Sequence, residues 1–150
     1  MIVNGSRLAA TAPLQPMLTT KDRANGVSHG LAEAGYDVRI AQSVTLHPLR
    51  RFTLASTVEK FVMPSGLVGI VHDKSTWARR GLSVFNTVIE PGWHGWLTLE
   101  LAYHGFRPLR IPAGAGIAQV LFHQTAEQAA YSGKYQGQPN RPVEAIMERG

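Results

Sequence analysis

The 150-residue chain has 44% hydrophobic and 17% charged residues, a composition typical of a folded globular protein and not of a disordered one. Its formal net charge of +5 favours anionic partners, a class that includes nucleotides as well as nucleic acids. The basic residues are scattered and no basic helix or nucleic-acid-binding motif accompanies them, which disfavours a nucleic-acid partner. The length predicts one domain over residues 1–150.

The chain contains no cysteine, which excludes disulfides, thiol catalysis and the zinc site of the zinc-dependent nucleobase deaminases. Its six histidines show no metal-ligand spacing, so we expect no zinc and no other protein-held metal. No apolar run approaches the roughly 18 residues of a membrane span, and the N-terminus lacks a signal-type apolar core. We therefore expect a soluble cytoplasmic protein that does not bind membranes.

The pattern of short elements predicts a mainly β fold. Residues 1–20 lack a clear period and are expected to form an N-terminal arm, and 21–35 a polar lead-in. Alternating or apolar runs predict strands at 36–40, 44–46, 51–62, 67–72, 82–89, 93–103 and 117–123. Residues 82–89 are expected to belong to a hairpin. Turns are expected at 64–66 and at Pro91-Gly92. After position 123 the polar, glycine-containing segment 124–150 is expected to be a lid or tail that is either mobile or ordered by a ligand or a neighbouring subunit.

One short helix is expected at 75–81, where Ser75 is a candidate N-cap and Gly81 a natural C-terminal residue. Lys74, Ser75 and Thr76 at its start, with Arg79 one turn later, combine hydroxyls and cations in a way that suits phosphate. An ordinary capped surface helix with solvated cations explains the same residues.

The strand at 93–103 places Leu97, Leu99, Leu101 and Tyr103 on one face, which must be core. Glu100 lies on the other face, beside Thr98. Partial burial there would raise the pKa of its carboxyl toward neutrality, which suits a group that must both take and give a proton. A solvated glutamate on an edge strand is the alternative.

Glu90 precedes the Pro91-Gly92 turn, where it is either an ordinary turn residue or a ligand for a sugar hydroxyl or a water. In the tail, Tyr131, Lys134, Tyr135 and Gln138 are either a lid that closes on phosphates and base or part of a disordered terminus.

Five segments together resemble the dCTP deaminase branch of the trimeric dUTPase-like superfamily. They are AGYDVRI, DKSTWARRGL, IEPGWHGWLTLEL, IAQVLF and KYQGQ, in this order between about positions 35 and 138. The resemblance implies a distorted jelly-roll or dUTPase-like β-barrel that assembles as a homotrimer with active sites at the subunit interfaces. It also implies metal-independent deamination of dCTP to dUTP and ammonia, with Mg²⁺ carried by the substrate triphosphate.

The resemblance also implies a role for individual residues. Glu100 would be the general acid and base, helped by Arg79. The substrate-binding positions would be Lys74, Ser75, Thr76 and Arg79 for phosphate, Glu90 near the sugar, Thr98 and Leu99 beside the base, Gln119, and Tyr131, Lys134 and Gln138 from the tail.

The chain departs from the family pattern in three places. The eight residues between Gly81 and Glu90 are fewer than usual, Glu90 stands where aspartate is usual, and the segment 37–48 is short, as in a phage-type member acting in a host cytoplasm. A dUTPase or a bifunctional deaminase–diphosphatase is therefore one alternative. A non-catalytic nucleotide-binding regulatory protein on the same fold is another.

Overall fold

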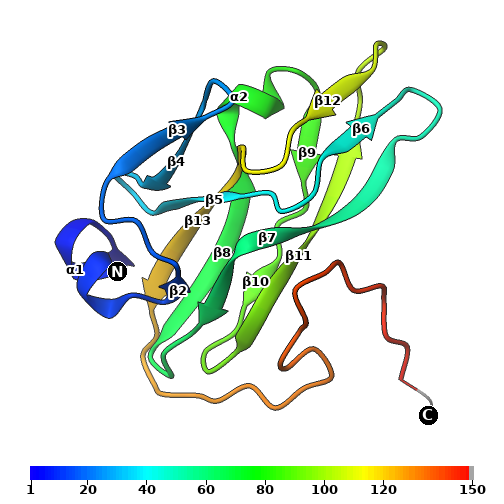
Figure 1. The fold of residues 1–150 in the computed structure, drawn as a ribbon. Coiled ribbons are helices and arrows are strands. Elements are labelled where there is room, and N and C mark those ends of the chain that lie inside the picture. Colours follow the sequence, from blue (N-terminus) through cyan, green and yellow to red (C-terminus); the bar gives the residue numbers. More distant parts are fainter. Residues whose placement is uncertain (149–150) are drawn as a thin grey trace.

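The computed structural model describes residues 1–148, and these form a mainly antiparallel β structure, as the sequence predicts (Figure 1). The N-terminal elements are β1 (Ile2–Val3), α1 (Gly5–Thr11), β2 (Leu14–Gln15), β3 (Lys21–Ala24), β4 (Val27–Leu31), β5 (Tyr36–Arg39) and β6 (Val44–Leu46). Then follow β7 (Phe52–Val62), β8 (Leu67–Asp73), α2 (Ser75–Ala78), β9 (Leu82–Val84), β10 (Val88–Ile89), β11 (His94–Tyr103), β12 (Leu109–Ile111) and β13 (Gly116–Gln124).

Two sheets enclose the core. The larger has the order β10-β8-β13-β5-β4-β3, with β1 added on β13, and the smaller has the order β2-β7-β11-β9. A short pair, β12-β6, extends one end of the molecule. Leucines 97, 99 and 101 on β11 are buried with Val71 and Val120 of the larger sheet in one apolar cluster. The predicted core face of β11 is therefore confirmed.

Alternation of buried and partly buried residues over 67–72 of β8 and 118–123 of β13 gives the larger sheet an inner and an outer face. Val71, Val120 and Tyr36 lie in one register row and are fully or almost fully buried. Burial raises the pKa of the Tyr36 phenol, although the backbone N–H of Leu18, which donates to its oxygen, opposes the rise. The neighbouring row, Gln119 with its partners on β8 and β5, faces outward because successive residues of a strand point to opposite sides.

The N-terminal third is more regular than the sequence suggests. Residues 1–20 contain α1 and two short strands, so the chain has two helices in its described part and not the single one expected. Residues 21–35 hold the β3–β4 hairpin. Its turn, Asn25-Gly26, has positive φ at both positions (54° and 76°), which matches the twist of paired strands.

The segment 82–89 is not a hairpin, which corrects the expectation. β9 pairs with β11 in the smaller sheet, whereas β10 pairs with β8 in the larger one. The connection 85–87 therefore crosses from one sheet to the other. Alternation alone could not reveal this crossing, because both short strands show the same local pattern.

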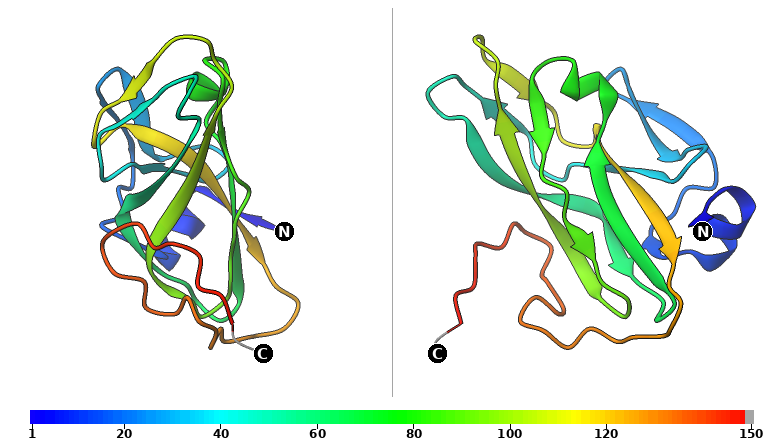
Figure 2. Two further views of the ribbon diagram at one scale, coloured as in Figure 1. Left: turned by 90° about the vertical axis from the view of Figure 1, so that its right-hand side faces the viewer. Right: turned by 180° about the vertical axis from the view of Figure 1, so that it is seen from behind.

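The tail, 124–148 in the described part of the chain, packs against the body of its own chain. From the end of β13 it runs beneath the sheets and turns up beside β11 (Figures 1 and 2). The backbone N–H of Tyr131 donates to the carbonyl oxygen of Pro91 at 2.8 Å, and Gln138 forms a bridge with Gly95. α2 lies at the opposite end of the sheets in both figures.

Candidate active site

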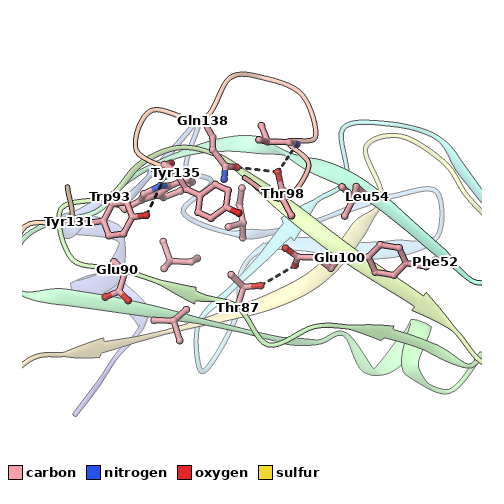
Figure 3. A pocket seen from close by; sticks show the side chains of 15 residues that line it. Phe52, Leu54, Thr87, Glu90, Trp93, Thr98, Glu100, Tyr131, Tyr135 and Gln138 are labelled. Atoms are coloured by element: carbon pink, nitrogen blue, oxygen red, sulfur yellow. Dashed lines mark hydrogen bonds between the residues drawn. The ribbon is translucent and has the colours of Figure 1, made fainter. Parts of the chain in front are cut away.

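A cavity of about 470 Å³ lies between β11, β10 and the tail, a size suited to a small organic ligand. Figure 3 shows side chains from all these elements pointing into it. It is lined by Phe52, Leu54, Thr87, Val88, Ile89, Glu90, Trp93, Leu97, Thr98, Glu100, Tyr131, Tyr135, Gln138, Val143 and Ala145. Most of the lining is apolar. Within residues 1–148, its charged lining groups are two carboxylates, and no lysine or arginine lines it.

Glu100 stands on the outer face of β11, as its place in the strand predicts. It is half-buried and lies directly opposite Leu54 of β7. One carboxylate oxygen, Oε2, accepts a hydrogen bond of 3.0 Å from the hydroxyl of Thr87. The second oxygen, Oε1, has no hydrogen-bonding partner within residues 1–148, so it is available to a ligand or a water.

Glu90 lines the same cavity at a distance along the wall from Glu100 (Figure 3). It is exposed and opens the predicted turn, which the N–H of Trp93 closes onto its carbonyl oxygen at 3.1 Å. The indole N–H of Trp93 donates to the carbonyl oxygen of Tyr135 at 2.7 Å. These bonds hold β11, the turn and the tail together at the place where Trp93 and Tyr135 line the cavity.

The tail closes one side of the cavity because two glycines let its backbone approach. Gly92 and Gly95 have φ of 74° and 143°, values that side chains rarely tolerate. A Cβ on Gly95 would lie 2.6 Å from the backbone nitrogen of Gln138. The side-chain oxygen of Gln138 accepts a hydrogen bond of 3.1 Å from Thr98, whose hydroxyl in turn accepts the N–H of Val143 at 3.0 Å.

The predicted phosphate-binding residues form a second group on and around α2, outside this cavity. Ser75, Thr76 and Arg79 are exposed. Arg79 makes no ion pair within residues 1–148. α2 begins after Lys74, which takes the N-cap position expected of Ser75, and spans only four residues.

Lys74 differs from the other members of this group because it is buried. Its ammonium bonds the carboxylate oxygen Oδ2 of Asp37 and the hydroxyl of Ser28. The indole N–H of Trp77 donates to the carbonyl oxygen of Gly116 at 2.6 Å. Together these bonds fix α2 to the larger sheet.

Three further predicted residues lie apart from the cavity lining. The Leu99 side chain is buried in the core, on the face of β11 opposite Glu100. Gln119 lies on the outer face of the larger sheet, in register with Asp37. Lys134 is exposed on the tail, 5.4 Å from the ring of Tyr135 and 3.7 Å from Glu148.

Sequence reasoning missed several residues that line the cavity. Phe52 and Leu54 belong to the outward-facing set of β7, and their alternation with Thr53 and Ala55 was a usable signal. Thr87 had no such signal, because its position depends on the crossing of 85–87 between the sheets. Val143 and Ala145 line the cavity only because the tail runs beside it.

Two structural features are absent from residues 1–148. No helix in this range is both long and apolar enough to cross a membrane. The range also contains no group of three or more histidine, aspartate or glutamate side chains placed to hold a metal ion.

The fold is that of the dUTPase-like proteins. One solved relative, a mutant dUTPase from phage phi11 of S. aureus in which a structural Mg(II) ion is coordinated, aligns with a TM-score of 0.55 at 19% identity, covering 68% of this chain and 84% of that one. Within this class the sequence matches are more specific. The model of the dCTP deaminase-like family matches residues 17–125, and the chain belongs to that family.

Curated relatives agree with the family match. A dCTP deaminase of Herpetosiphon aurantiacus is 35% identical, with 83% of this chain and 86% of that protein covered. A dCTP deaminase of Francisella tularensis subsp. novicida is 36% identical over 75% of this chain and 77% of its own length.

Proposed function

We propose that this protein is a dCTP deaminase that converts dCTP and water to dUTP and ammonia. The observation that carries the proposal is the half-buried Glu100, which presents one free carboxylate oxygen to a largely apolar cavity of base-plus-sugar size. Such a carboxylate can take a proton from water and return it to a substrate held in the same cavity. The family membership of the chain supports the same activity.

The reaction balances with Glu100 as the only protein acid and base. Glu100 removes a proton from a water as its oxygen bonds to C4 of the cytosine, and delivers that proton to the ring nitrogen N3. A second proton passes from the new hydroxyl through Glu100 to the amino group. The C4–N bond then breaks, ammonia leaves, and the ring is uracil. Efficient transfer requires the carboxylate to be held accurately against C4.

The triphosphate needs cations, and within residues 1–148 the charged groups that line the cavity are Glu90 and Glu100. We infer a homotrimer in which α2 of a neighbouring subunit brings Arg79, with Ser75 and Thr76, to each cavity. Arginine suits phosphate because its planar fork donates two parallel hydrogen bonds. The outer face of the larger sheet carries partly exposed apolar side chains that a neighbour would cover: Val68, Ile70, Val88 and Leu121.

Mg²⁺ belongs to the substrate in this proposal. The residues 1–148 offer no cluster of carboxylates or histidines for a resident ion, whereas triphosphate oxygens are hard ligands that Mg²⁺ prefers. Glu90, exposed at the cavity rim, is placed in this scheme near the sugar, and Tyr131, Lys134 and Gln138 act from the tail. The base is flanked by Thr98 and by the backbone of Leu99.

Hydrolysis of dUTP to dUMP and pyrophosphate is the second candidate. It is favoured by the fold, which dUTPases share, and by Glu90, a second carboxylate on the cavity wall that could orient a water. A regulatory protein that binds nucleotides without turning them over is a weaker third candidate, since it has no evident use for Glu100.

Product analysis separates these candidates. The purified protein is incubated with Mg²⁺ and either dCTP or dUTP, and the products are resolved by ion-exchange chromatography. We expect dCTP to give dUTP and ammonia and dUTP to remain. Release of dUMP and pyrophosphate would establish the second candidate, and binding of either nucleotide without turnover would establish the third.

A further inference from the structure

The connection between β9 and β10 is tied to Glu100 twice, once through the backbone and once through the side chain. The N–H of Phe85 donates to the carbonyl oxygen of Glu100 at 3.1 Å. Two residues later, the hydroxyl of Thr87 donates to the carboxylate oxygen Oε2 at 3.0 Å, a bond drawn in Figure 3. The direction of this bond is fixed because an ionised carboxylate can only accept.

The position of Thr87 is itself fixed from the other sheet. Its carbonyl oxygen accepts the N–H of Val71 on β8 at 3.1 Å, and the next residue, Val88, pairs with Ile70. The hydroxyl has a second possible acceptor, the carbonyl oxygen of Phe85, but at 3.4 Å this contact is longer. The larger sheet thus holds Thr87 in place, and Thr87 in turn bonds the side chain of Glu100 on the smaller sheet.

We propose that Thr87 is a positioning residue, which holds Oε2 of Glu100 so that Oε1 alone meets the substrate. This inference rests on the proposed deaminase function. A glutamate side chain has three rotatable bonds, and one anchored oxygen removes most of its freedom to swing away from C4. The ring of Phe85, two residues before Thr87, packs near the ring of Phe52, which lines the cavity, with centroids 6.1 Å apart.

The test compares three variants of Thr87 in the full-length protein. Thr87→Val keeps the shape of the side chain without the hydroxyl, Thr87→Ala removes both, and Thr87→Ser keeps the donor. For Val and Ala we expect kcat on dCTP to fall about 10- to 100-fold, because a loosened general base spends less time in the reactive geometry. KM should change less than threefold by a rough estimate, because Thr87 would not act through substrate affinity. The Ser variant should retain kcat within about threefold.

Thr11→Val is the matched control, because its hydroxyl likewise donates one hydrogen bond, to the carbonyl oxygen of Arg7 in α1, but away from the cavity. Thr11→Val should leave kcat and KM unchanged. Circular dichroism establishes that Thr11→Val and each Thr87 variant fold, and if Thr87→Val does not fold, the Ala and Ser variants decide the question.

Two results would overturn the inference while leaving the deaminase function intact. One is a wild-type kcat in the Val and Ala variants, and the other is an equal loss of kcat in the Ser variant. Absence of dUTP formation by the unmodified protein would instead overturn the proposed function itself.

Discussion

The cavity differs in what it can do alone from the α2 surface, the group formed by Lys74, Ser75, Thr76 and Arg79. The cavity has a carboxylate with one free oxygen and the volume for a base and sugar, but its charged lining groups are negative. The α2 surface has an exposed, unpaired arginine and two hydroxyl side chains, but lies outside that cavity. Neither region would bind and deaminate a nucleoside triphosphate by itself. Under the proposed function, a second chain would bring the two groups together.

Glu100→Gln should have the largest effect on activity. Gln keeps the size of the side chain but cannot take a proton from water, so kcat on dCTP should fall by about 10³-fold or more. The fall in kcat is measured by following ammonia release and dUTP formation. Glu127→Gln, which changes an exposed tail residue, is the matched control and should leave kcat unchanged. Turnover of Glu100→Gln within a few-fold of the unmodified protein would remove Glu100 from the mechanism.

A mixing experiment tests whether the two regions meet between subunits. Arg79→Ala should also lose most turnover, since Arg79 is expected to contact the triphosphate. When the Glu100→Gln and Arg79→Ala proteins are unfolded together and refolded as a mixture, some sites combine an intact Glu100 from one subunit with an intact Arg79 from another. Random assortment makes this about a quarter of the sites of a cyclic trimer.

The expected result for equal amounts of the two variants is recovery of roughly a quarter of the unmodified activity in the refolded mixture, and only the residual activity of each variant when it is refolded alone. Size-exclusion chromatography confirms that the mixture assembles. If the two residues acted within one chain, no mixture could contain an intact site, and the activity would stay at the level of the separate variants.

The regular features of the fold could be predicted from the sequence because period-2 alternation fixes strands and their faces. The burial of Leu97, Leu99 and Leu101, with Glu100 on the opposite face, follows from that pattern alone. The Asn25-Gly26 dipeptide, although it lies in a polar stretch, is also typical of a two-residue hairpin turn.

The remaining features depend on pairings between distant segments. Thr87 reaches Glu100 only because β9 and β10 belong to different sheets, and nothing local in the segment 82–89 encodes that crossing. The sequence predicts Lys74 either as a phosphate ligand or as a solvated cation, whereas the structure buries it against Asp37, which lies 37 positions earlier. The composition of the tail likewise does not reveal where it packs, which depends on its close approach to Gly92 and Gly95.

Substitution of Lys74 should have the smallest effect on catalysis. It also separates a residue with a structural role from the residues of the α2 surface that are expected to bind the ligand. Its ammonium is the only hydrogen-bonding partner of the Asp37 side chain in residues 1–148, and the other oxygen of Asp37, Oδ1, is buried without a partner. Removing one member of such a pair leaves an uncompensated charge. Lys74→Met should therefore lower the free energy of unfolding by about 3–5 kcal/mol. Arg79→Ala should change it by less than about 0.5 kcal/mol, because Arg79 is exposed and unpaired.

Urea unfolding followed by circular dichroism measures both values, and the double variant Lys74→Met with Asp37→Leu supplies the control. Replacing both charges by apolar groups removes the unpaired carboxylate, so the double variant should recover most of the lost stability. It should also retain part of its turnover, because Arg79, Ser75 and Thr76 remain. A stable Lys74→Met protein that binds dCTP as poorly as Arg79→Ala would show the reverse: Lys74 would leave Asp37 to contact the triphosphate, and the whole α2 group would serve the ligand.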